Sequence, residues 1–147
     1  MAVFERVLVA ADFSEASGRA VELAVAIARE TGAELHVVNV CEIPDYGEFP
    51  TAVDLVTPLS ETAARRLGEL VASLRGVVPG VRGALKVGVA WEQILAAADE
   101  LGADLLVVGT HGRRGIAHAV MGSVAERVVR MSRIPVLTAR SRVADGR

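Results

Sequence analysis

Five short apolar runs alternate along the chain with four amphipathic patterns, and this alternation limits the fold more than any other feature. The runs are rich in β-branched residues and are flanked by glycine, proline and charged residues, as strands are. They span residues 7–11, 35–40, 81–89, 105–108 and 135–139. Strands that alternate with helices form a parallel sheet covered on both faces. The sequence therefore predicts an α/β fold with a single five-stranded, doubly wound parallel sheet.

The third run indicates the order of the strands. In residues 81–89 apolar side chains alternate with Arg82, Lys86 and small residues, which is typical of a half-exposed edge strand. The first, second and fourth runs are nearly unbroken apolar, as interior strands are. An edge position for the third strand favours the flavodoxin-like (Rossmann-like) order 3-2-1-4-5. In that order the chain winds outward from strand 1 and returns to its other side with strand 4.

The helical patterns have start and stop signals. We expect the first helix over residues 15–31, with Ser14 as N-cap and Gly32 as the stop. The second is expected near 60–75, the third ends at Gly102, and the fourth runs over 123–130 with Val124, Val128 and Met131 on its apolar side. Residues 44–58 contain too many helix breakers to be regular, and the role of this loop, up to residue 60, stays open.

Length and composition describe the class of protein. The chain has 147 residues, which fits one domain over residues 1–140 followed by a short polar tail over 141–147. No apolar run approaches the roughly 20 residues that span a bilayer. The formal net charge is -2 and no basic stripe or aromatic platform is evident, so we expect neither nucleic acid nor membrane as a partner. The single cysteine, Cys41, and the charged N-terminus without a leader predict a cytoplasmic protein.

A glycine-rich segment joins the fourth run to the fourth helical pattern. Its glycines and one hydroxyl lie at Gly109, Gly112, Gly122 and Ser123. Glycine allows close backbone approach, and a helix N-terminus offers unpaired N–H groups and the positive end of its dipole. These features suit a di- or triphosphate, and the Arg113-Arg114 pair adds positive charge. The alternative, that the glycines only form a long turn and cap a helix, stays open.

Two better-known phosphate loops do not fit this segment. Walker A requires lysine before the serine or threonine, whereas Gly122 and Ser123 are preceded by Met121. The dinucleotide fingerprint is absent after the first strand. The histidines and the cysteine form no metal-ligand spacing either, so we expect no metal held by protein ligands.

Asp12 closes the first strand as Gly109 closes the fourth. In open parallel sheets ligands bind beyond the carboxyl ends of the strands, where the winding direction reverses. With the predicted order, strands 1 and 4 flank that point. Asp12 is then placed to accept hydrogen bonds from ribose hydroxyls while residues 109–123 hold phosphates. The alternative interpretation is that Asp12 caps a turn with Ser14.

The chain resembles the ATP-binding branch of the universal stress protein family. The resemblance is carried by VLVAADFSE at residues 7–15, GADLLVVGTHGRRG at 102–115, GSVAER at 122–127 and IPVL at 134–137. The spacing Gly-x2-Gly-x9-Gly-Ser/Thr separates family members that bind ATP from those that bind no nucleotide. One departure is Ala10, where the family often has proline.

The resemblance implies a set of contacts and an assembly. Asp12 would contact ribose, the backbone at Val37 would meet adenine, and the Gly109–Gly115 loop with Ser123 and Val124 would hold the phosphates. Mg²⁺ or Mn²⁺ would arrive with the phosphates. The family also implies a homodimer through the last strand, and a short apolar edge at residues 134–139 is compatible with it.

These observations favour an ATP-binding stress-response module that acts as a nucleotide-dependent switch or interaction protein, with slow ATP hydrolysis left open. One alternative is a genuine ATPase or a nucleotidyl or phosphoryl transferase, for which Asp12, His111 and the two arginines are the sole candidates. None of them lies in a recognisable catalytic motif, so no catalytic residue is assigned. Another alternative is a dimeric scaffold with a vestigial site. Trp91 is expected to pack, and Cys41 to be buried and inert.

Overall fold

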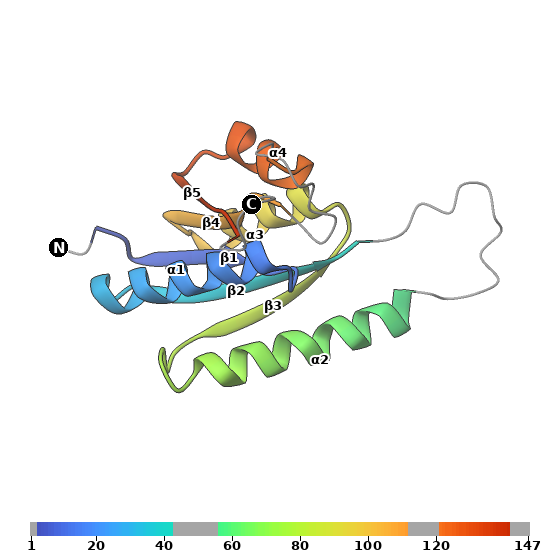
Figure 1. Cartoon of the computed structure of the whole chain (residues 1–147), viewed down its shortest axis with the longest axis horizontal. Coiled ribbons are helices and arrows are strands. Elements are labelled where there is room, and N and C mark those ends of the chain that lie inside the picture. Colours follow the sequence, from blue (N-terminus) through green and yellow to red (C-terminus); the bar gives the residue numbers. More distant parts are fainter. Residues whose placement is uncertain (1–2, 43–55, 112–120, 142–147) are drawn as a thin grey trace, which may run out of the picture.

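The computed structural model describes residues 3–42, 56–111 and 121–141. Figure 1 shows strands and helices in alternation along the chain. The elements are β1 (Arg6–Ala10), α1 (Glu15–Thr31), β2 (Glu34–Cys41), α2 (Val56–Leu74), β3 (Arg82–Val87), α3 (Ala90–Leu101), β4 (Leu105–Gly109), α4 (Ser123–Met131) and β5 (Val136–Ala139). The caps of α1 are confirmed, because Ser14 accepts a hydrogen bond from the backbone N–H of Ser17 and Gly32 adopts the left-handed conformation at φ 73°. Gly102 ends α3 in the same way.

The five strands form one parallel sheet in the order β3-β2-β1-β4-β5, which confirms the predicted topology. β1 pairs with β2 on one side and with β4 on the other, so the winding direction reverses between β1 and β4. β3 lies at one edge, as predicted, and most of its side chains are exposed. The predicted alternation was wrong, because Val87 is exposed whereas Lys86 is half-buried and bonded to Glu100 of α3. The other edge is β5.

Two hydrophobic layers cover the two faces of the sheet. Val7 and Val9 of β1 point toward α1 and α2, whereas Leu8 between them points toward α3 and α4. All three side chains are fully or almost fully buried. Alternation of this kind is what a strand buried on both faces requires, and each such side chain contributes about 1.5–3 kcal/mol through burial. Among the described residues, no helix is long and apolar enough to cross a membrane.

Three further local predictions were wrong. α2 begins at Val56, four residues before its expected start, and it includes Pro58 in its first turn, where the missing N–H has no helical partner to lose. The expected loop residues 44–55 lie outside the described ranges. Met131 is 52% exposed because Ala125 and Val128 form the buried face of α4. Cys41 is only partly buried, since β2 extends past the end of β1 there.

The first turn of α1 packs directly on the end of β4. A Cβ atom added at Gly109 would lie 2.7 Å from the backbone carbon of Ala16 and 2.8 Å from the nitrogen of Ser17. Such distances are too short for real Cβ contacts, and the atoms in the way are backbone. Glycine at this position therefore has a packing reason, because it allows α1 to approach the sheet at the point where β4 ends.

We expect Gly109→Ala to lower the free energy of unfolding by about 1–3 kcal/mol, because α1 has to move away from β4. Gly68→Ala is the matched control. Gly68 lies inside α2 with open space around its Cα, so a methyl group there raises helix propensity and adds about 0.5–1 kcal/mol. Urea unfolding of the two variants measures both changes. Equal effects of the two substitutions would contradict the packing argument.

Candidate functional site

A crevice site is expected where β1 and β4 lie side by side and the chain leaves them in opposite directions. α1 follows β1 on one face of the sheet, and α4 follows β4 on the other (Figure 1). Asp12 lies in the short connection between β1 and α1. Gly122 and Ser123 lie at the start of α4. The two segments that carry the predicted site thus begin from neighbouring strands.

The connection after β1 is a tight turn organised by hydrogen bonds. The backbone N–H of Ser14 donates to Oδ1 of Asp12 at 2.9 Å, and the backbone N–H of Asp12 donates to Oγ of Ser17 at 2.9 Å. Asp12 therefore caps a turn with Ser14, as the alternative interpretation held. The turn uses only one carboxylate oxygen, and the described residues donate no hydrogen bond to Oδ2. The side chain is partly exposed, so Oδ2 is available to a ligand donor.

The start of α4 lacks the side-chain cap that α1 has. Its N-cap residue is Gly122, in an extended conformation at φ -63° and ψ 158°, and this glycine supplies no side-chain cap to the first turn. The carbonyl oxygen of Gly122 accepts only from Glu126, one turn further along. Unpaired first-turn N–H groups and the positive end of the helix dipole attract anions. This helix end suits a phosphate group.

Thr110 and His111 tie the two segments together. The backbone N–H of Gly122 donates to the carbonyl oxygen of Thr110, while the N–H of Thr110 donates to the carbonyl of Ala139 in β5 at 2.8 Å. Oγ of Ser14 donates to the carbonyl oxygen of His111 at 3.4 Å. The Asp12 turn and the start of α4 are therefore both hydrogen-bonded to the two residues that follow β4, Thr110 and His111.

His111 also has an unpaired ring nitrogen. Its Nδ1 lies 3.2 Å from Oγ1 of Thr110, and its Nε2 is buried without a hydrogen-bond partner. A buried polar atom of this kind is costly unless a water or ligand satisfies it. His111 is thus a polar group held between the two loops.

The other residues predicted to bind the nucleotide differ in their position and burial. Val37 is fully buried inside the sheet, where β2 pairs with Val9 of β1 and with Gly83 of β3. Val124 is partly buried against the α3 and α4 layer. Gly109 lies against α1, as described above. The remaining four predicted residues, Gly112, Arg113, Arg114 and Gly115, lie outside the described residues. Asp12 is bonded to Ser17, which lies against Gly109, and Gly122 is bonded to Thr110, the residue after Gly109. The ligand contacts proposed for these residues, for Ser123 and for Val37 stay a prediction.

One buried polar residue near this end of the sheet was missed by sequence reasoning. Asn39 is 5% exposed, its Nδ2 donates to the carbonyl of Ala11 at 2.7 Å, and its Oδ1 has no partner. The bond to Ala11 fixes the residue that precedes Asp12. The available signal was a polar amide inside the otherwise apolar stretch 37–40.

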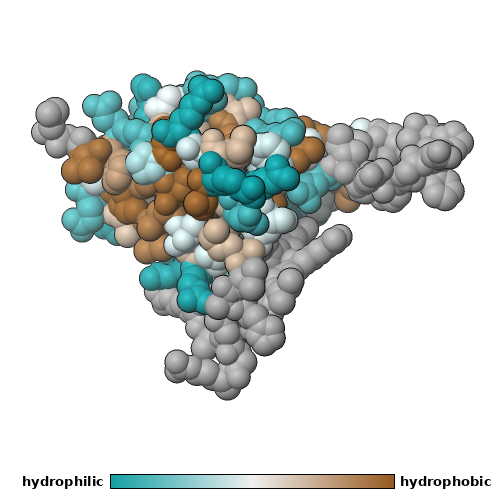
Figure 2. Space-filling view, turned by 90° about the horizontal axis from the view of Figure 1, so that it is seen from above, coloured by the Kyte–Doolittle hydropathy of each residue, from teal (hydrophilic) through white to brown (hydrophobic). Residues whose placement is uncertain are grey.

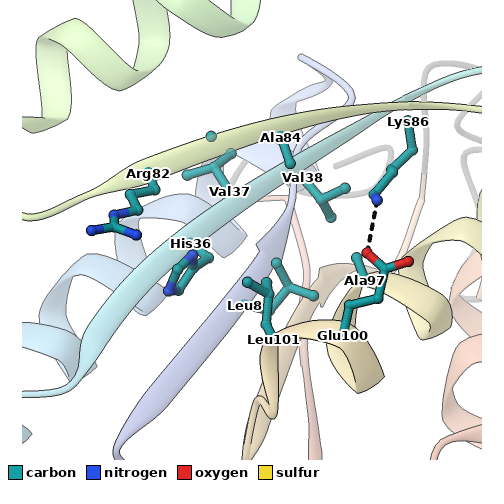
Figure 3. A pocket seen from close by; sticks show the side chains of 11 residues that line it. Leu8, His36, Val37, Val38, Arg82, Ala84, Lys86, Ala97, Glu100 and Leu101 are labelled. Carbon is teal, nitrogen blue, oxygen red and sulfur yellow. Dashed lines mark hydrogen bonds and ion pairs between the residues drawn. The ribbon is translucent and has the colours of Figure 1, made fainter.

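A groove of about 200 Å³ lies elsewhere, between β2, β3 and α3 (Figure 3). Its floor is apolar, and Arg82 and His36 line one end. Lys86 lies at the other end and donates to Glu100 of α3 at 2.8 Å. The groove is lined by Leu8, His36, Val37, Val38, Arg82, Gly83, Ala84, Lys86, Ala97, Glu100 and Leu101. It shares only Val37 with the predicted site, so it is a separate surface feature.

The sequence pattern of the universal stress protein family matches residues 4–140. The chain belongs to the universal stress protein family. A universal stress protein of Thermus aquaticus is 36% identical over 139 residues, which cover 94% of this chain and 100% of the relative. Family membership makes the chain a stress-response protein and agrees with its sheet order.

Two solved structures of this family contain nucleotides. A universal stress protein in complex with cAMP is 26% identical, has a TM-score of 0.69 and is matched over 94% of this chain and 98% of its own. A universal stress protein of Archaeoglobus fulgidus in complex with dAMP is 25% identical, has a TM-score of 0.63 and is matched over 93% and 98%. Both ligands are adenine nucleotides.

Proposed function

We propose that this universal stress protein binds ATP in the crevice between β1 and β4 and works as a nucleotide-dependent switch or interaction module. The uncapped N-terminus of α4 behind Gly122 carries the proposal, because it offers N–H donors and a positive dipole end. At the same end of the sheet, Oδ2 of Asp12 accepts no hydrogen bond from the described residues. The N–H groups can donate to an anion, and the carboxylate oxygen can accept from a hydroxyl group. Together they match the phosphates and the ribose of a ribonucleotide. The adenine nucleotides bound to the two family members support the choice of base.

Each residue has a proposed role. The backbone N–H groups of Ser123 and Val124 and the hydroxyl of Ser123 would bind phosphate oxygens, and Oδ2 of Asp12 would accept from a ribose hydroxyl. Val37 would offer its backbone to adenine only if the neighbouring strands or side chains shift, since it is fully buried. Four further phosphate ligands are proposed from sequence alone: Gly112, Arg113, Arg114 and Gly115.

A divalent cation is proposed to arrive with the nucleotide. The described residues contain no group of three or more histidine, cysteine or acidic side chains that fits a metal ion. Mg²⁺ or Mn²⁺ would therefore be held mainly by phosphate oxygens and waters, as Mg²⁺ usually is in nucleotide sites. Such an ion would offset the negative charge that Asp12 brings to the crevice.

Binding rather than catalysis is the proposed activity. Phosphoryl transfer needs a positioned base or water-orienting group and cationic groups at the γ-phosphate. His111 is the one described residue of the site that has a buried, unpaired titratable nitrogen, and its carbonyl oxygen accepts from Ser14 of the Asp12 turn. Slow hydrolysis would depend on this residue. A turnover that disappears in His111→Ala, with ATP binding retained, would favour the enzyme hypothesis instead.

We expect Gly122→Val to abolish ATP binding while the protein stays folded. The conformation of Gly122 is open to a valine, but the added side chain would fill the approach to the first-turn N–H groups of α4. Isothermal titration with ATP and Mg²⁺ measures the loss. Gly80→Val is the matched control, because Gly80 has open space around its Cα and lies before β3, and it should bind like the wild type. A wild-type protein that is folded and free of nucleotide but binds no ATP would refute the proposal.

We further propose a homodimer through β5. The carbonyls of Pro135 and Ala139 accept from Leu106 of β4 and from Thr110 directly after it. By alternation the backbone groups of Val136 and Thr138 therefore face outward from the edge of the sheet. Exposed apolar side chains lie nearby on α4, where Val129 is 42% and Met131 52% exposed. Figure 2 views the molecule from the α4 side and shows apolar surface there among hydrophilic side chains. A second copy would cover this edge.

Thr138→Pro tests the dimer. Proline removes the outward N–H of Thr138 without removing a bond to β4, so the protomer should fold while the dimer dissociates. Thr138→Val keeps the N–H and is the control. Sedimentation velocity should give a dimer for the wild type and the valine variant and a monomer for the proline variant. A wild-type monomer at all concentrations, or a proline variant that stays dimeric, would exclude β5 as the interface.

A further inference from the structure

Phe13, the residue directly after Asp12, has an unusual backbone conformation. Its φ is 67°, and it is the one non-glycine residue with a positive φ in the described part of the chain. A bulky side chain seldom adopts this conformation, because its Cβ crowds the backbone. Phe13 is also the middle residue of the turn in which the N–H of Ser14 reaches Oδ1 of Asp12. The conformation of Phe13 therefore decides where the carboxylate of Asp12 points.

Arg66 of α2 holds Phe13 from outside the turn. The Cζ atom of Arg66 lies 4.3 Å from the centroid of the Phe13 ring, which is a close cation–π contact. The guanidinium has no carboxylate partner among the described residues, and its side chain is half-buried. α2 otherwise packs on β3 and β2, at the side of the sheet away from β4 (Figure 1). The contact thus connects α2 to the loop that carries Asp12.

We propose that Arg66 is a positioning residue that, through the ring of Phe13, keeps the Asp12 turn closed and its Oδ2 directed at the ribose hydroxyls. The proposal rests on the ATP site proposed above. Hydrogen bonds from Ser14 and to Ser17 fix the turn on the α1 side. Arg66 adds a contact on the α2 side to the apolar contacts that Phe13 makes with the core, so loss of Arg66 makes departure of Phe13 from the positive-φ region easier. The turn would then open for part of the time, and Asp12 would lose its orientation.

The binding test compares ATP with 2′,3′-dideoxy-ATP, which lacks both ribose hydroxyls. We expect Arg66→Ala to weaken ATP binding by about three- to tenfold, the range that corresponds to the loss of one cation–π contact, and to leave binding of the dideoxy nucleotide unchanged. In an Asp12→Ala background, Arg66→Ala should have no further effect on ATP binding. Arg65→Ala is the matched control, because Arg65 is an exposed neighbour with no such contact, and Arg66→Lys should restore part of the affinity.

A second measurement needs no nucleotide. Exchange of the Ser14 amide with solvent, measured by NMR on the whole chain, should be faster in Arg66→Ala than in the wild type or Arg65→Ala. Equal exchange and equal ATP affinity in the two alanine variants would overturn the proposal, as would equal weakening of ATP and dideoxy-ATP. If the wild type binds no ATP, the proposed function is refuted. The exchange rate of the Ser14 amide still tests whether Arg66 stabilises the turn.

Discussion

The pairing of β1 with β4 is the constraint on which the rest of the structure depends. β1 pairs with β2 on one side and with β4 on the other. The winding direction therefore reverses at β1, and α1 and α4 lie on opposite faces of the sheet. The same pairing brings the carboxyl ends of two strands together. Gly109 then allows α1 to pack against the end of β4. The proposed site therefore follows from topology, and its chemistry comes from the few residues that follow each strand.

The two sides of the crevice are built differently. On the β1 side, Asp12, Ser14 and Ser17 satisfy one another, so the turn is closed and rigid and one carboxylate oxygen is left over. On the β4 side, Gly122 begins α4 without a side-chain cap. A protein that leaves helix N–H groups unpaired beside a closed, oriented carboxylate suits a ligand with an anionic end and a hydroxyl-bearing body. This contrast is the physical basis for proposing a nucleotide.

The sequence predicted the sheet order, the edge position of β3 and the caps of α1, because each follows from a local pattern: unbroken apolar runs, a period of two, and Ser14 and Gly32 at the helix ends. It did not predict the start of α2 at Val56, since proline is usually a breaker and its tolerance depends on its place in the first turn. The exposure of Cys41 depends on β1 being shorter than β2, which no local pattern shows.

For the candidate site, the sequence indicated which residue types take part but not which residues they contact. Asp12 and Ser123 were proposed from their positions in the sequence, but the packing role of Gly109 depends on the approach of α1, a contact distant in sequence. The amide of Asn39 and the positive φ of Phe13 likewise depend on neighbours. Arg66 lies on α2, more than fifty positions after Asp12, and nothing in its surroundings marks it. Such contacts become visible only when the sheet order has placed the elements.

The nucleotide is proposed to bind at the ends of β1 and β4 and not at another surface. Titration of ¹⁵N-labelled protein with ATP and Mg²⁺, followed through backbone amide shifts, tests this most directly. We expect the largest changes at Asp12, Ser123 and Val124, with Arg82 and Glu100 in the groove beside α3 unchanged. Changes centred on that groove, or no saturable change at all, would contradict it.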